Sequence, residues 1–443
     1  MMKNSFQWLT KIVIAIFLFQ PAIVLKVDSL DIGFTAKAAE STKKKTRRTP
    51  AMREKIYSQL ARAQKLADEK NVAEGLEILE SLNKRADQLN SYEQAMVWNA
   101  LGFIYYSNDK INQAVAAFEQ VVKQENIPES LELSTLFSLA QLSMQAEKYE
   151  QSLTYLSKWE ALKEGEAIDK GLVLKANAYY ALKDYAAAEK AISSAISKVE
   201  AEGKVAKENW LVLKRALHYE LKQPRQVTQV SEKLVRHYSK PKYWIELSNM
   251  YGEVGEATKQ LAVLEAAYQQ GFVTNKSDIR SLAQQYFFSG APYKAAKLMS
   301  EQLAKGNIEG DIKTLQFLAQ AWSAAKEGDK AIPVLLDAAK QSSDGNIDAQ
   351  LAEVLVNQSK YEQAIEVANR AKEKGELKNP GHVDVALGMA HYNLKNYNQA
   401  IDHFKLAAKD DKVNKMAQKW LQFVTSEKLN QERLKQSVAA IGY

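Results

Sequence analysis

Residues 95–128 read AMVWNALGFIYYSNDKINQAVAAFEQVVKQENIP, and this stretch decides the fold. Its apolar residues recur at helical spacing in two successive runs, which predicts two amphipathic helices joined by a short turn. Gly102 in the first run and Ala114 in the second lie twelve positions apart, where the helices of such a hairpin approach most closely. Small residues at that point let the side-chain ridges of the two helices interlock. The residues of the pattern are Trp98, Leu101, Gly102, Tyr105, Ala114, Phe118 and Val121.

The same frame recurs along most of the chain. Ten units begin near residues 56, 95, 133, 169, 207, 241, 276, 312, 345 and 381, at intervals of 33 to 39 residues. Helix hairpins of this length stack into solenoids, because a single hairpin cannot bury its apolar face. Over roughly residues 52–425 the chain resembles the tetratricopeptide repeat (TPR) family, whose period is about 34 residues. The resemblance implies an all-α fold, a right-handed superhelical α-solenoid of about ten helix hairpins.

The last segment, residues 413–443, is predicted to be a capping helix and tail. Met416, Trp420 and Phe423 share one helical face, while the lysines of this segment lie elsewhere. A helix of this kind suits the exposed end of a repeat stack. The solenoid itself is therefore assigned to residues 52–412.

The N-terminus has the features of an export signal. Lys3 and Lys11 precede an apolar run at residues 12–25. Ala36 and Ala38 then supply the small-x-small pattern that a signal peptidase cleaves.

We therefore predict a signal peptide over residues 1–38 and a location in the periplasm of a Gram-negative bacterium, with the exported chain beginning at Ala39. An uncleaved inner-membrane anchor is the alternative, although a short run broken by Pro21 would span a bilayer poorly. The chain has no cysteine, which excludes a lipid-modified cysteine, disulfide bonds and thiolate metal sites.

Positive charge is concentrated directly after this signal. The formal net charge is +7, of which +4 falls on residues 39–48, and the solenoid is nearly neutral. We predict that residues 39–51 form a basic, flexible, solvated leader; contact of this leader with anionic lipid heads or an acidic partner is the alternative. Nucleic-acid binding is disfavoured by the near-neutral repeats. The basic residues of the leader are Lys43, Lys44, Lys45, Arg47 and Arg48.

The sequence shows no catalytic or metal-binding pattern. Its five histidines are scattered over distant units, and it has no glycine-rich phosphate loop and no nucleophile elbow. Repeat solenoids build extended surfaces more readily than desolvated pockets. We therefore predict that the chain is not an enzyme and binds no cofactor or metal.

Stacked hairpins of this kind build a concave groove from the first helix of each unit. The repeat frame places amide side chains at one equivalent position of that groove, where they can pair with both the donor and the acceptor of an extended peptide backbone. We predict a peptide- or protein-binding groove; polar residues on a solvated face are the alternative. The predicted groove residues are Asn99, Phe103, Tyr106, Phe137, Gln141, Asn177, Tyr180, Asn249, Gln284, Phe287 and Gln320.

A narrower resemblance joins the leader to the first repeats. Its residues are Arg47, Arg48, Thr49, Pro50, Ala51, Met52, Arg53, Tyr57, Leu60, Ala63, Gln64, Ser91, Tyr92, Glu93, Trp98, Asn99, Gly102, Phe103, Tyr105, Tyr106 and residues 127–131. Together they resemble the periplasmic TPR proteins that accompany TonB and its motor partners ExbB and ExbD. This resemblance implies an auxiliary scaffold of a TonB-dependent transport system. An envelope or outer-membrane assembly factor, and a scaffold subunit of a cell-wall enzyme complex, are the alternatives.

Overall fold

The computed structural model describes residues 49–163 and 169–441. The predicted signal peptide and the five basic residues of the leader lie outside these described residues. Within them every regular element is a helix, and no strand occurs. The prediction of an all-α fold is therefore confirmed.

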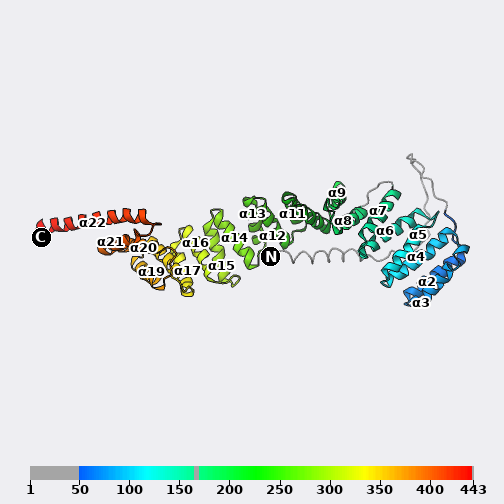
Figure 1. Cartoon of the computed structure of the whole chain (residues 1–443), viewed down its shortest axis with the longest axis horizontal. Coiled ribbons are helices and arrows are strands. Elements are labelled where there is room, and N and C mark those ends of the chain that lie inside the picture. Colours follow the sequence, from blue (N-terminus) through cyan, green and yellow to red (C-terminus); the bar gives the residue numbers. More distant parts are fainter. Residues whose placement is uncertain (1–48, 164–168, 442–443) are drawn as a thin grey trace. The chain divides into compact units, whose positions relative to one another are not determined.

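The chain divides into two compact units, Met1–Tyr238 and Ser239–Tyr443. Within each unit, consecutive helices pair into hairpins joined by short turns (Figure 1). The helices of the first unit are α2 (Glu54–Asp68), α3 (Val72–Asn83), the 3₁₀ turn η1 (Ala86–Gln88), α4 (Ser91–Ser107), α5 (Ile111–Val122), α6 (Glu129–Gln145), α7 (Tyr149–Leu162), α8 (Asp169–Ala181), α9 (Tyr185–Ala201), α10 (Glu208–Glu220) and α11 (Pro224–Tyr238).

The second unit repeats this arrangement and adds a single long helix. Its helices are α12 (Pro241–Glu253), α13 (Ala257–Gln269), α14 (Lys276–Phe288), α15 (Pro292–Ala304), α16 (Ile312–Ala324), α17 (Gly328–Gln341), α18 (Asn346–Asn357), α19 (Tyr361–Lys374), α20 (Pro380–Asn393), α21 (Tyr397–Ala407) and α22 (Asn414–Ile441). In the described residues the two units thus hold ten hairpins followed by one terminal helix. The predicted α-solenoid of about ten hairpins is confirmed.

The two helices of a hairpin meet at residue pairs twelve positions apart. In eight of the ten hairpins both members of the pair are Gly, Ala or Ser, and all of them are buried. A Cβ atom added at Gly102 would lie 2.6 Å from the Phe118 ring, and one added at Gly388 would lie 2.8 Å from the Phe404 ring. No side chain fits at such a distance, so the small residue sets how closely the helices pack. The eight pairs are Ala63/Gly75, Gly102/Ala114, Ala140/Ser152, Ala176/Ala188, Ala283/Ala295, Ala319/Ala331, Ala352/Ala364 and Gly388/Ala400.

Serine at these close-contact positions adds a hydrogen bond between the two helices. The buried Ser152 hydroxyl donates to the Ala140 carbonyl at 2.8 Å, across the contact between α6 and α7. In the α12–α13 hairpin, Ser248 donates to the Gln260 carbonyl at 3.0 Å. Both bonds span twelve residues, which confirms that the same contact recurs in different hairpins.

All ten hairpin turns have one backbone conformation. In each, the residue two positions after the first helix has a positive φ, and the next N–H donates to the carbonyl five residues before it at 2.8 or 2.9 Å, as Lys110 N does to Tyr105 O. This is the Schellman arrangement that ends a helix. Only two of the ten positive-φ residues are glycine, so the sequence carries no glycine signal at the other turns. The ten turn residues with a positive φ are Lys70, Asp109, Glu147, Lys183, Lys222, Gly255, Gly290, Lys326, Ser359 and Lys395.

The terminal helix differs from its prediction in length and in the face that it buries. α22 runs from Asn414 to Ile441 and so occupies nearly all of the segment predicted as a capping helix and tail. Ala417 and Val424 are fully buried, whereas Met416 and Phe423 are 42% and 50% exposed. The small Ala417 allows close approach to the preceding hairpin, and the larger residues of the predicted sealing face are left at the border of the contact or outside it.

A buried carboxylate joins the start of the solenoid to its second hairpin. Glu93, in the first turn of α4, is fully buried and receives the Arg53 N–H at 3.0 Å, Nε at 2.8 Å and Nη2 at 2.6 Å. Asn90 and Glu93 also form a reciprocal capping box at the start of α4. The hydrogen bonds from Arg53, together with those from the Asn90 backbone, lower the pKa of Glu93 to about 2, although burial alone would raise it.

We expect Gly102→Leu to destabilise the first unit by about 1 to 3 kcal/mol, because the added atoms must displace Phe118. Gly102→Ala combined with Phe118→Leu should recover most of the stability that Gly102→Ala alone loses, since the smaller side chain vacates the contested space. Urea unfolding and hydrogen exchange measure both effects. Exchange should rise near residues 56–170 and stay unchanged beyond residue 345; uniform loosening of the whole chain would contradict the repeat architecture.

We expect Glu93 to make the first unit acid-sensitive. The pKa of Glu93 is about 2 in the folded chain and 4.5 in the unfolded chain. Ionised Glu93 therefore stabilises the fold fully above pH 4.5, and this stabilisation is lost as the pH falls from 4.5 towards 2. Arg53→Met should lower the stability of the first unit at neutral pH, because it leaves the buried Glu93 carboxylate without its guanidinium partner. Denaturant titrations at several pH values test this. Equal acid sensitivity of wild type and Glu93→Gln would show that the pair is not responsible.

Candidate protein-interaction surfaces

One row of residues on the first helices follows directly after the small close-contact residue of each hairpin. We call this the central row: Phe103 on α4, Gln141 on α6, Asn177 on α8, Asn249 on α12, Gln284 on α14 and Gln320 on α16. Asn249, Gln284 and Gln320 are exposed, and Gln141 and Asn177 are half-buried. Because the preceding residue is fixed against the second helix, each member of the row projects from the same place on its hairpin.

The amides of the central row differ in whether the chain already uses them. Asn177 Nδ2 donates to the Val173 carbonyl at 2.8 Å within its own helix. In the part of the chain that the structure describes, the side chains of Gln141, Asn249, Gln284 and Gln320 make no hydrogen bond. These four amides therefore keep both donor and acceptor available, whereas one donor of Asn177 is occupied.

The row falls into two stretches, one in each unit. Gln141 and Asn177 lie on successive first helices of the first unit. Asn249, Gln284 and Gln320 lie on three successive first helices of the second unit, α12, α14 and α16. The second unit thus carries the longer stretch of exposed amides.

The predicted aromatic residues fall into two groups. Phe103 and Tyr106 are 44% and 37% exposed, and the Phe103 ring rests edge-on against the buried Phe118 at 5.3 Å. Phe103 therefore combines a fixed orientation with an accessible face. Asn99, on the same helix, is half-buried.

The other three aromatic residues pack mainly between helices. Phe137 contacts Trp159 at 5.3 Å, and Tyr180 contacts Tyr185 at 5.7 Å. Burial raises the pKa of Tyr180. Phe287 packs against Phe317 of the next hairpin at 5.7 Å.

An aromatic residue beside the central row was missing from the prediction. Phe288, the last residue of α14, is 81% exposed and meets Phe287 edge-on at 5.6 Å. It lies one helical turn after Gln284, on the same side of α14. The repeat frame stops at the preceding residue, so only an inspection of aromatic residues at helix ends could have identified Phe288 from the sequence.

A family model described as "Tetratricopeptide repeat" matches residues 97–126, which lie within α4 and α5 and the turn after them. Residues 97–126 are a tetratricopeptide repeat. The match supports the wider assignment of the chain as a TPR protein, because the other nine hairpins share its turn and its twelve-residue contact spacing. No curated protein sequence matches the chain.

Several solved TPR structures are similar in fold. A tetratricopeptide repeat protein from Parabacteroides merdae ATCC 43184 is 13% identical with a TM-score of 0.35, and the match covers 60% of this chain and 98% of that chain. The TPR2AB domain of yeast Sti1, solved as a complex with pHSP90, is 16% identical with a TM-score of 0.33, covering 58% and 98%. YrrB, described as a TPR protein with an unusual peptide-binding site, is 16% identical with a TM-score of 0.34, covering 43% and 96%.

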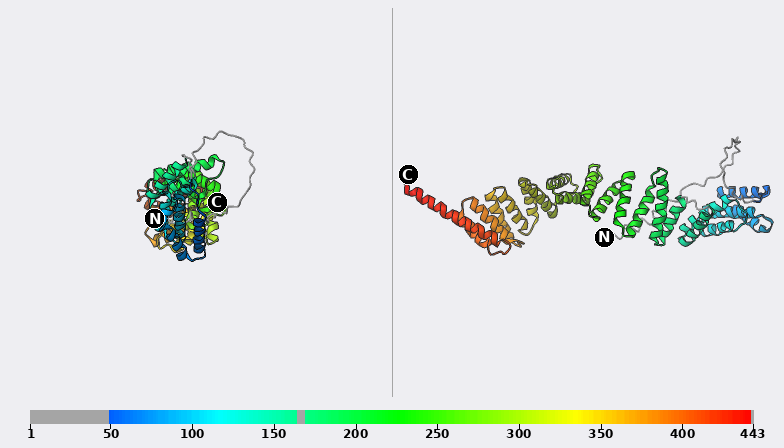
Figure 2. Two further views of the ribbon diagram at one scale, coloured as in Figure 1. Left: turned by 90° about the vertical axis from the view of Figure 1, so that its right-hand side faces the viewer. Right: turned by 90° about the horizontal axis from the view of Figure 1, so that it is seen from above.

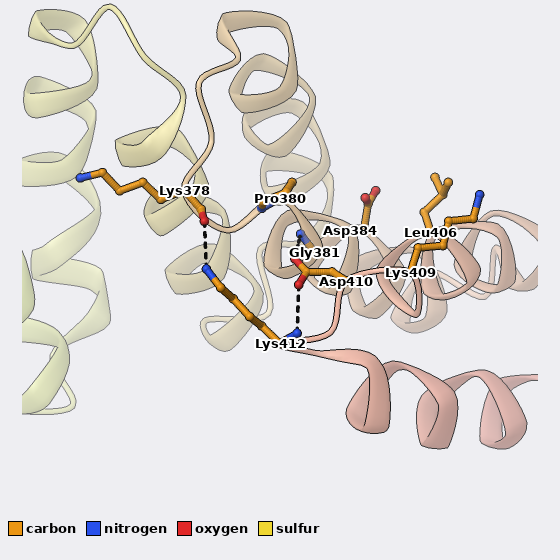
Figure 3. A pocket seen from close by; sticks show the side chains of 8 residues that line it. All are labelled: Lys378, Pro380, Gly381, Asp384, Leu406, Lys409, Asp410 and Lys412. Carbon is orange, nitrogen blue, oxygen red and sulfur yellow. Dashed lines mark hydrogen bonds between the residues drawn. The ribbon is translucent and has the colours of Figure 1, made fainter.

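A hollow of about 460 Å³ lies between the last two TPR-like helices and the start of α22 (Figure 3). Asp410 Oδ2 accepts the Gly381 N–H at 3.0 Å at the beginning of α20, where a free helix N-terminus would attract an anion. Lys412 Nζ donates to Asn379 Oδ1 at 2.8 Å and to the Lys378 carbonyl at 3.3 Å. The chain itself satisfies these groups, so they offer no anion site. The lining residues are Lys378, Pro380, Gly381, Asp384, Leu406, Lys409, Asp410 and Lys412.

Two histidines stack inside the last hairpin. The rings of His391 and His403 are parallel, with their centroids 5.5 Å apart. His403 Nδ1 lies 3.1 Å from Asp384 Oδ1, which also receives Lys372 Nζ at 2.8 Å. Burial of Asp384 opposes its ionisation, but these two partners hold its pKa below the usual range. Burial, with a smaller effect of His403, lowers the pKa of His391.

This cluster is a packing feature and not a metal centre. In residues 49–163 and 169–441, no group of three His, Asp or Glu side chains is arranged to hold a metal ion. Over the same part of the chain, none of the helices combines the length and the apolar character needed to cross a membrane. The predicted apolar run at residues 12–25 lies outside this part.

We expect His391 to weaken the last hairpin at mildly acidic pH. The folded chain holds the imidazole neutral, whereas the unfolded chain takes up a proton near the ordinary pKa of about 6.5. Stability should therefore fall as the pH drops from about 7.5 to 5.5, and His391→Gln should remove part of that fall. Hydrogen exchange in α20 and α21, followed as a function of pH in wild type and variant, measures the loss of stability. The exposed His237→Gln is the matched control, and an equal change in that variant would refute the assignment.

Proposed function

We propose that this chain is a non-catalytic protein-interaction scaffold of the bacterial periplasm, auxiliary to a TonB-dependent transport system. The observation that carries the interaction role is the central row, whose exposed amides at Asn249, Gln284 and Gln320 make no hydrogen bond within the described chain. Periplasmic location is supported by the export signal that the sequence predicts at residues 1–38, and the TonB association by the residues that resemble that group of TPR proteins.

The row is suited to an extended segment of a partner protein. A primary amide presents two donors and one acceptor with two lone pairs, so it can bind both the C=O and the N–H of a peptide backbone. Such binding is largely independent of side chains, and specificity then comes from neighbouring apolar contacts. Phe288 supplies such a contact beside Gln284, and Phe103 and Tyr106 supply one in the first unit.

The same geometry favours a scaffold over a reaction site. Two carboxylates with lowered pKa values, Glu93 and Asp384, are engaged in ion pairs with Arg53 and Lys372. The central row itself contains amides and one phenylalanine, which bind partners but supply no nucleophile or general base. The leader residues Lys43, Lys44, Lys45, Arg47 and Arg48 would add attraction to an anionic membrane surface or an acidic partner.

We expect two triple variants to lose partner capture. Phe103, Gln141 and Asn177 are changed to Ala in the first unit, and Asn249, Gln284 and Gln320 in the second. Each set removes backbone-pairing groups and leaves the small residues of the hairpin contacts in place; the first set also removes the edge contact of Phe103 with Phe118. Capture of TonB, ExbB or ExbD should weaken about tenfold or more if a set includes one residue whose truncation costs about 1.4 kcal/mol or more.

The control variant removes three exposed amides from second helices: Gln113, Gln226 and Gln229, all changed to Ala. Tagged proteins, shown to be folded by circular dichroism, are incubated with envelope extracts, and the three TonB-system components are quantified by immunoblot. Equal capture by wild type and both row variants would exclude the central row as the binding site. Failure of wild type to retain any of the three components would refute the TonB association.

A further inference from the structure

The terminal helix α22 exposes a side that the rest of the unit leaves uncovered. The helix begins against α21 and extends well beyond it (Figure 2, right). Val413, Ala417 and Val424 are buried in the contact with the last hairpin. The adjacent side of the helix carries Met416 and Phe423, which are 42% and 50% exposed.

Of these two residues, Phe423 belongs to a cluster of aromatic rings. Trp420 stacks on the fully buried Phe404, with ring centroids 5.7 Å apart and planes 7° from parallel. Phe423 meets Trp420 edge-on at 5.8 Å and Tyr392 at 5.5 Å. An exposed aromatic ring that is already ordered loses little conformational entropy when it binds a partner.

Two free cations lie beside the apolar residues. Lys415 and Lys419 are one helical turn apart and, with Met416 and Trp420, line a hollow of about 360 Å³ at the start of α22. Within residues 49–163 and 169–441 neither ammonium group makes an ion pair or a hydrogen bond. The two carboxylates of α22 are engaged elsewhere, because Glu432 pairs with Lys428 and Glu427 accepts a hydrogen bond from Gln431.

We propose that this surface, formed by Lys415, Met416, Lys419 and Phe423, binds an acidic peptide segment that also carries apolar side chains. Charge complementarity selects the acidic partner, since neither ammonium group is paired with a carboxylate of the described residues. Met416 and Phe423 select the apolar side chains. The surface is separate from the central row and gives the scaffold a second attachment point, so its test does not depend on the row.

The same features favour a peptide over a lipid surface. A helix that lies in a membrane interface needs a continuous apolar face. On α22 the side that carries Met416 and Phe423 continues with Glu427 and Asn430, which interrupt it before Leu434. A hollow lined by two lysines and two apolar side chains suits an individual acidic or apolar side chain of a partner.

The probe is a fluorescent synthetic peptide of interspersed Asp, Glu, Leu and Phe residues. A second peptide with Asn and Gln in place of Asp and Glu has the same shape without the charges. Full-length protein should bind the acidic peptide, bind its amide analogue several-fold more weakly, and lose affinity for the acidic peptide as salt is added. Lys415→Gln with Lys419→Gln should weaken binding about three- to tenfold, and Met416→Gln should weaken it as well.

The matched control is Lys428→Gln with Lys435→Gln, which removes two charges from another side of the same helix. It should bind like wild type. The proposal is overturned if wild type does not bind the acidic peptide, if both peptides bind equally, or if the control variant loses as much affinity as the test variant. Tighter binding to vesicles of phosphatidylcholine and phosphatidylglycerol, with the same dependence on Lys415 and Lys419, would also overturn it in favour of a lipid surface.

Discussion

The close approach of two helices at a pair of small residues is the contact on which the rest of this structure depends. Where Gly102 meets Phe118 and Gly388 meets Phe404, there is no room even for one additional carbon atom. The phenylalanine ring of the second helix can pack against the first helix there only because the glycine has no side chain. In eight of the ten hairpins, a pair of small residues twelve positions apart therefore sets how closely the two helices approach.

That contact also determines which side chains are available for binding. The residue that follows the small close-contact residue lies outside the closest contact between the two helices, so its side chain projects from the surface of the first helix. Because the sequence repeats, the same position projects in successive hairpins. Asn249, Gln284 and Gln320 form a row for this reason. The uniform turn reinforces the arrangement, since all ten hairpins end their first helix with the same backbone hydrogen bond.

Buried ion pairs add specificity to this apolar framework. Asp348, fully buried at the start of α18, pairs with Arg370 at 2.7 Å and with Lys374 at 2.8 Å, both from α19. Arg53 and Glu93 play the corresponding role between the first two hairpins. Removal of one partner from a buried pair is costly, whereas the intact pair contributes little compared with apolar packing. Such pairs therefore fix which segments lie next to each other more than they increase overall stability.

The sequence by itself determined the helical class, the number of hairpins and their boundaries to within a few residues, because small and large residues recur at fixed spacing. It also identified the positions of the central row, which follow from helical periodicity alone. Only the tertiary structure decided which of these side chains are accessible. Phe137 and Tyr180 pack against the second helix of their own hairpins, Phe287 packs against the next hairpin, and Asn177 bonds its own helix. Periodicity places these side chains on a helix face but does not encode which contacts they make. The same holds at the C-terminus, where Ala417 and not Phe423 became the buried contact: helix packing depends on the closest approach of two surfaces, and a small residue reaches it first.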